Sequence, residues 1–183
     1  MTAHPLFTSV TFAALLLAAS APASAGNIED CRSKAQLTTA ARLKACSAVI
    51  DAKQAAAPDL AFAYYKRAMT ASADPKADQV QVMADVSKAI DIDPKLMEAY
   101  AFRALGYNKA LQYDKAIGDL SSAIALAPDR WGLFSLRAMI HAQNKDPKAA
   151  LADYRSALAL NPPATSAEMI RQRVARLEQD TNQ

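Results

Sequence analysis

Three prolines recur at a fixed period of 34 residues, and each ends nearly the same short phrase. The phrases occupy residues 89–94, 123–128 and 157–162 and read AIDIDP, AIALAP and ALALNP. A period of this length is typical of stacked repeats in which each unit is one helix–turn–helix. The spacing therefore predicts an all-α solenoid of antiparallel helix pairs, in which each pair buries its apolar face against its neighbours.

Within each predicted unit, small and large apolar residues alternate at matched positions. Six residues after Pro58, Pro94 and Pro128 the chain has Tyr64, Tyr100 and Phe134, and ten residues after them it has Ala68, Ala104 and Ala138. Alanine lets two helix backbones approach closely, and the larger residues fill the space between them. The spacing from Pro58 to Pro94 is two residues longer than the others, which predicts an insertion in the turn at about 72–76.

These residues resemble the tetratricopeptide-repeat family, and the resemblance covers about residues 58–162. The chain departs from the family pattern in two ways: it has alanine where the family often has glycine, and it keeps the second aromatic residue only as Tyr107, with Ala71 and His141 in the other units. The resemblance implies a right-handed superhelical solenoid with three repeats at 58–94, 95–128 and 129–162. It also implies an interaction scaffold that is not an enzyme.

Residues 1–25 have the pattern of a secretory signal peptide. They contain no charged side chain, are nearly all apolar from Leu6 to Ala19, and end in Ala23-Ser24-Ala25. An uncleaved anchor is the alternative, but the apolar stretch is short for a span of about 20 residues. We therefore expect cleavage before Gly26, a periplasmic or secreted location, and no stable membrane insertion of the mature chain.

The segments that flank the repeats are predicted to cap the solenoid. Residues 26–57 are predicted to form helices at about 27–36, with Asn27 as its cap, and 39–53. They resemble the entry helices of exported bacterial members of the family. Cys31 and Cys46 are the only cysteines, and an even pair in an exported chain favours a disulfide over two buried thiols. Residues 163–183 are predicted to form one further helix from Ser166, preceded by a capping box of Thr165 and Glu168.

The sequence offers little chemistry. His141 is the only histidine after residue 25, and it falls at a packing position in a repeat helix. The chain has no glycine-rich phosphate loop and no cluster of metal ligands in its sequence. Its net charge of +3 is spread along the chain, which does not favour nucleic-acid binding. We expect a protein without enzymatic activity and without a cofactor.

One charged pattern repeats in all three units. An arginine stands immediately before the alanine of each first helix, and an aspartate stands immediately before the large residue of each second helix. Separate solvation of these groups is the alternative, but their closeness to packing positions favours a partly buried structural ion pair. The predicted pairs are Arg67–Asp85, Arg103–Asp119 and Arg137–Asp153.

The first helices carry the functional hypothesis. The resemblance implies that they line a concave groove, which in the family usually receives an extended peptide or a helix. The candidate groove residues are largely apolar, although any one of them could instead be inter-repeat core: Phe62, Tyr65, Met69, Phe102, Leu105, Asn108, Leu136 and Met139. We expect a protein or peptide partner with an apolar segment. The alternatives are a carrier or sensor of an apolar small molecule, and self-association through a terminal helix.

Overall fold

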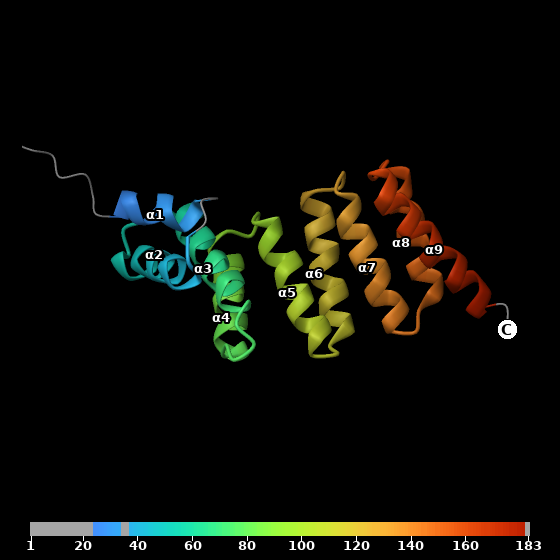
Figure 1. Cartoon of the computed structure of the whole chain (residues 1–183), viewed down its shortest axis with the longest axis horizontal. Helices are drawn as coiled ribbons and strands as arrows, with labels where there is room; N and C mark the ends of the chain where they lie inside the picture. Colours follow the sequence, from blue (N-terminus) through green and yellow to red (C-terminus); the bar gives the residue numbers. More distant parts are fainter. Residues whose placement is uncertain (1–23, 34–36, 182–183) are drawn as a thin grey trace, which may run out of the picture.

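The computed structural model describes residues 24–33 and 37–181, which form nine α-helices and no strand. The helices follow one another in chain order along an elongated molecule (Figure 1). Most of the predicted signal peptide lies outside the described residues. The helices are α1 (Ser24–Arg32), α2 (Thr39–Ala52), α3 (Ala57–Ala71), α4 (Gln79–Ile92), α5 (Met97–Lys109), α6 (Tyr113–Leu126), α7 (Trp131–Gln143), α8 (Pro147–Ala159) and α9 (Ala164–Thr181).

The repeats are the antiparallel pairs α3–α4, α5–α6 and α7–α8, and each pair also packs against the next, so the fold is a helical solenoid. Within the second pair and within the third, a short turn of the same kind joins the two helices. Leu111 in one turn and Lys145 in the other adopt a left-handed backbone conformation, with φ of 58° and 59°. The first pair has a longer turn at residues 72–78. The predicted insertion is therefore present there, and α3 also ends earlier relative to its buried alanine than α5 or α7 does.

Buried alanines mark the places where the two helices of a repeat cross. Ala68, Ala104 and Ala138 are fully buried in the first helices. The second helices place larger residues beside them, and Leu120 and Tyr154 are among the largest side chains of the core. Small residues at the crossings thus bring the helices close together, while large residues fill the remaining volume.

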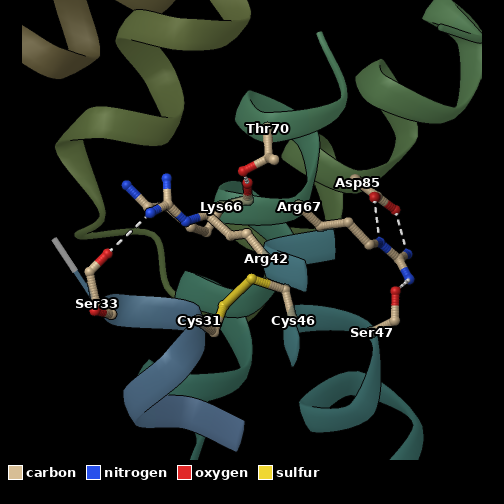
Figure 2. The surroundings of a disulfide bond; sticks show 9 residues. All are labelled: Cys31, Ser33, Arg42, Cys46, Ser47, Lys66, Arg67, Thr70 and Asp85. Carbon is tan, nitrogen blue, oxygen red and sulfur yellow. Dashed lines mark hydrogen bonds and ion pairs between the residues drawn. A yellow bond between two sulfur atoms is a disulfide. The ribbon is translucent and has the colours of Figure 1, made fainter. Parts of the chain in front are cut away.

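The N-terminal pair is closed by a disulfide between Cys31 and Cys46, whose Cα atoms lie 4.9 Å apart (Figure 2). The bond joins α1 to α2, as predicted. The predicted bounds of the first helix were wrong: α1 begins at Ser24, so Asn27 lies inside it, and it ends at Arg32 instead of residue 36. The carbonyl of Ser33, just after the helix, accepts a hydrogen bond from Arg42, so the chain turns here towards α2.

The C-terminal helix α9 covers the last repeat. It buries Ala167 and Ile170, with Val174 and Leu177 packed at the edge of the same core. The predicted capping box was wrong, because the helix already begins at Ala164 and Glu168 bonds to side chains of α9 itself. The backbone of Pro163 instead accepts the first amide bond, from Ala167. In the part of the chain that the structure describes, no helix has the length and apolarity to cross a membrane.

Candidate partner-binding surface

The eight predicted groove residues lie on the first helices of the three repeats, and we call them the first-helix surface. On α3 and α5 the aromatic members contact one another. The ring of Tyr65 lies 6.1 Å from that of Phe62 and 6.1 Å from that of Phe102, both edge to face. The Tyr65 hydroxyl donates to the sulfur of Met69 at 3.4 Å. These four side chains therefore form one continuous cluster across the first two repeats.

The remaining members differ in exposure. Leu105 is 46% exposed, which makes it the most accessible apolar side chain of the surface. Leu136 and Met139 are partly buried and pack against the core between the second and third repeats, as Tyr65 and Phe102 do against the core of the first repeat. Asn108 is partly buried, and its Oδ1 atom has no hydrogen-bond partner in the described part of the chain. The surface is thus most open around α5, and its α7 end contributes to the core.

Positive charge gathers where the first-helix surface meets the N-terminal pair. The Arg32 guanidinium and the Lys66 ammonium lie 5.3 Å and 5.9 Å from the centre of the Phe62 ring. Arg32 also pairs with Asp59. Burial and the neighbouring charge of Arg42 lower the pKa of Lys66 below its usual range. The positive charge at this end of the surface is thus partly balanced by Asp59.

The three predicted ion pairs are all present in the structure. Each arginine makes two parallel hydrogen bonds of 2.7–2.8 Å with the aspartate of the same repeat. The aspartate side chains are 5–10% exposed and the arginine side chains 18–23%. Hydrogen bonding to the aspartate is the main cause that raises the pKa of each arginine. Such bidentate pairs fix the relative rotation of the two helices.

Each arginine also has a further partner that was not predicted from the sequence. The remaining guanidinium nitrogen, Nη1, of Arg67, Arg103 and Arg137 donates to a serine on the preceding second helix. The acceptors are Ser47 at 3.5 Å, Ser87 at 3.3 Å and Ser121 at 2.9 Å. Ser87 and Ser121 each stand two residues after the aspartate of an ion pair. This repeated spacing is the signal in the sequence that could have predicted the serine bonds.

These bonds also reveal the register of α2. Because Ser47 occupies the place of Ser87 and Ser121, α2 is equivalent to the second helix of a repeat. Cys46 then corresponds to Leu120, and both are fully buried. Ala45 takes the place of the paired aspartate. The N-terminal cap is therefore a fourth helix pair, in which the half-cystine Cys46 takes the place of a core residue and a disulfide joins the two helices in the absence of an ion pair at Ala45.

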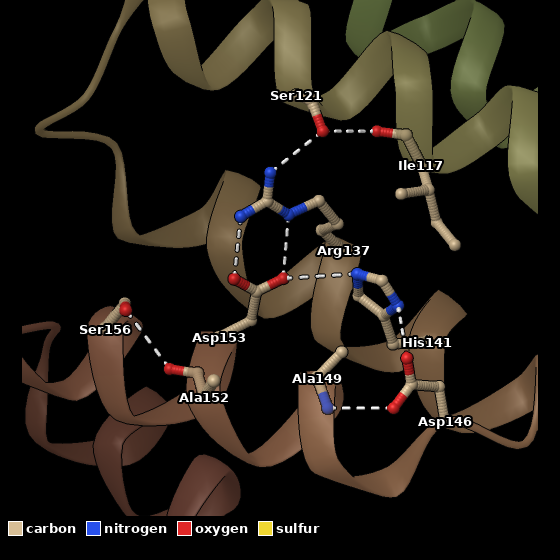
Figure 3. A network of polar contacts seen from close by, with 9 residues as sticks. All are labelled: Ile117, Ser121, Arg137, His141, Asp146, Ala149, Ala152, Asp153 and Ser156. Carbon is tan, nitrogen blue, oxygen red and sulfur yellow. Dashed lines mark hydrogen bonds and ion pairs between the residues drawn. The ribbon is translucent and has the colours of Figure 1, made fainter.

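His141 is part of the third ion-pair network (Figure 3). One imidazole nitrogen lies 3.9 Å from a carboxylate oxygen of Asp153, and the other lies 3.9 Å from Asp146. Asp146 also caps α8 by accepting a bond from the amide of Ala149. The histidine thus lies between two carboxylates that have structural roles. Among the described residues, no group of three or more histidine, cysteine or acidic side chains is placed to hold a metal ion.

Comparison with known proteins supports the repeat assignment. Residues 105–175 match a family model described as tetratricopeptide repeat. No curated protein matches the chain.

Several solved structures have a similar fold. The structure titled "MamA MSR-1 C2" is 12% identical, with a TM-score of 0.66, over 86% of this chain and 84% of that one. A tetratricopeptide repeat protein from Parabacteroides merdae is 14% identical, with a TM-score of 0.66, over 79% of this chain and 55% of that one. The first tetratricopeptide repeat domain of Spaghetti (RPAP3), bound to the HSP90 peptide SRMEEVD, is 19% identical, with a TM-score of 0.60, over 67% and 94%. At these identities the likeness concerns the fold.

Proposed function

Since this chain is a tetratricopeptide-repeat protein, we propose that it is an exported interaction scaffold that binds an apolar peptide segment or partner helix along its first-helix surface. The fold supports a protein-interaction scaffold, and one structural neighbour is bound to a peptide. The observation that supports the apolar partner is the continuous cluster of Phe62, Tyr65, Met69 and Phe102, with Leu105 exposed beside it. Apolar side chains gathered on an accessible surface usually mark a binding site.

The exported location belongs to the proposal. It is supported by the uncharged, apolar pattern of residues 1–25 and by the single pair of cysteines, which suits an oxidising compartment. Fractionation of cells that express the full chain tests it. The mature protein should begin at Gly26 and appear in the periplasmic or secreted fraction. Full-length protein in the membrane or cytoplasmic fraction would contradict it.

The surface itself is tested with Leu105→Asp, because this side chain is exposed and its replacement should leave the fold intact. We expect about tenfold or greater loss of partner capture, as when a central apolar contact is removed. The measurement is a crosslinking pull-down from periplasm, with circular dichroism and thermal melting of each purified variant.

Val80→Asp is the matched control, because Val80 is an exposed apolar residue on a second helix, outside the first-helix surface. It should capture the partner as the wild type does. Equal capture by Leu105→Asp would contradict the proposed surface. Capture of an apolar small molecule alone would favour a carrier, and concentration-dependent dimers sensitive to Leu105→Asp would favour self-association.

A further inference from the structure

A two-lobed cleft lies beside a glycine of α5, between the first and second repeats. Gly106 faces the side chain of Met83 on α4, and a Cβ atom at this position would lie 2.5 Å from the methionine sulfur. Clefts of about 350 Å³ and 200 Å³ lie beside this contact, and they share four lining residues: Gln79, Met83, Gly106 and Lys109. Gly106 thus lets Met83 lie against the backbone of α5, and we call the two-lobed space beside this contact the Gly106 cleft.

One repeat later, larger side chains stand at the corresponding positions. At a spacing of 34 residues, Tyr113 corresponds to Gln79, Ile117 to Met83 and Ile140 to Gly106. Ile140 is fully buried, and the other two pack against the same core cluster. The repeat architecture therefore does not require a hollow between neighbouring repeats. At the first junction, glycine and glutamine stand where the second junction has an isoleucine and a tyrosine.

The lining of the cleft indicates what would fill it. One lobe is lined partly by Phe102 and Leu105, so it opens beside the first-helix surface. Among the residues that line the two lobes, Lys109 is the one charged side chain, and it is exposed at the rim. The Lys115 ammonium lies 5.4 Å from the ring centre of Tyr107, which lines the larger lobe. The cleft is thus apolar inside and positively charged at its edge.

We propose that the Gly106 cleft is the anchor site for a partner peptide that carries a large apolar side chain next to a carboxylate. The apolar side chain fills the cleft, and the carboxylate pairs with Lys109. Pockets for drug-sized molecules usually measure about 300–1,000 Å³, so one lobe is at the lower limit and the other below it, a size that suits single side chains. This inference rests on the proposed function, since it specifies where the peptide is held.

In the test, peptides are first selected for binding to the whole mature protein. Their affinities for matched glycine variants are then measured. A library of random peptides displayed on phage is the probe, and the dissociation constants of the enriched peptides are measured by fluorescence anisotropy. Enriched peptides should carry a large apolar residue beside Asp or Glu. Gly106→Ala should weaken them about tenfold or more, because the displaced Met83 end enters the cleft and an apolar side chain loses its burial.

Gly118→Ala is the matched control, since a Cβ atom at Gly118 meets nothing within 4 Å. It makes the same change in helix propensity and should leave the affinity unchanged. A second variant, Lys109→Glu, does not alter the packing. It should weaken acidic peptides and, in a repeated selection, enrich basic ones.

The outcomes separate this inference from the proposed function. In one outcome, the peptides bind both glycine variants and Lys109→Glu as tightly as the wild type but lose affinity for Leu105→Asp. This would overturn the anchor site and leave the proposed scaffold function standing. A library from which the wild type retains no peptide would overturn both. Melting temperatures of the variants are compared first, so that loss of binding is read only from folded protein.

Discussion

The N-terminal helix pair and the three repeats share one geometry but hold it with different bonds. In the repeats, a bidentate Arg–Asp pair joins the two helices, and the arginine also reaches a serine of the preceding pair. In α1–α2 a disulfide joins the helices, and Ala45 stands where the aspartate would be. Among the described residues, this helix pair packs against the first repeat only, and the covalent bond holds its two helices together. The difference indicates that the helix crossing matters for the fold, whereas the chemistry of the bond across it is exchangeable.

Removal of one arginine should have the largest effect. Arg103→Ala leaves Asp119 buried without its cation, and we expect a loss of about 3–5 kcal/mol in the free energy of unfolding. Urea unfolding followed by circular dichroism gives this value. If the crossing is what matters, the double variant Arg103→Met with Asp119→Leu should recover most of the loss, because it resembles the apolar position of Ala45. A double variant as unstable as the single one would contradict the view that the chemistry of the bond across the helix crossing is exchangeable.

Loss of the disulfide should have a smaller and more local effect. Cys46→Ala opens a loop of 15 residues, for which the chain-entropy estimate is about 3 kcal/mol. Hydrogen exchange should speed up in α1 and α2 and stay unchanged in α5 to α8, because only the N-terminal pair depends on the bond. The reduced wild type should behave in the same way. Faster exchange throughout the chain would show that the N-terminal pair stabilises the whole array.

The serine bonds between neighbouring pairs should contribute least. Ser121→Ala removes a bond of 2.9 Å to a charged donor, and we expect a loss of about 1 kcal/mol in the free energy of unfolding. Ser87→Ala and Ser47→Ala should cost progressively less, because their bonds measure 3.3 Å and 3.5 Å. Thermal melting of the three variants checks the order. Three equal losses would mean that the serines act through packing alone.

The fold was largely predictable because its signal repeats. The proline period, the alanines at the crossings and the Arg–Asp pattern each occur three times, so a chance match at one position does not change the assignment. The ends were less predictable. Thr165 and Glu168 have the spacing of a capping box, but Pro163 starts α9 earlier, and a single local motif has no second copy that could reveal the error.

The candidate site was predictable only in part. Their positions in the sequence assigned Leu136 and Leu105 to the same surface. In the structure, Leu136 packs against the core between two repeats, whereas Leu105 is exposed. The Gly106 cleft depends on which side chain stands opposite the glycine across the repeat junction, and that is a property of three-dimensional contacts. Comparison of Gly106 with Ile140 could have suggested it, because the two residues are one period apart.

The shared guanidinium has a consequence for how stability is distributed along the array. Repeat proteins are often treated as a one-dimensional chain of units, with an intrinsic free energy for each unit and a separate coupling free energy for each interface. Here Arg137 contributes to both quantities, since it bonds Asp153 inside its own unit and Ser121 in the previous one. A unit that unfolds therefore also removes a bond from its neighbour. This linkage lengthens the cooperative segment and favours unfolding of the three repeats as one block.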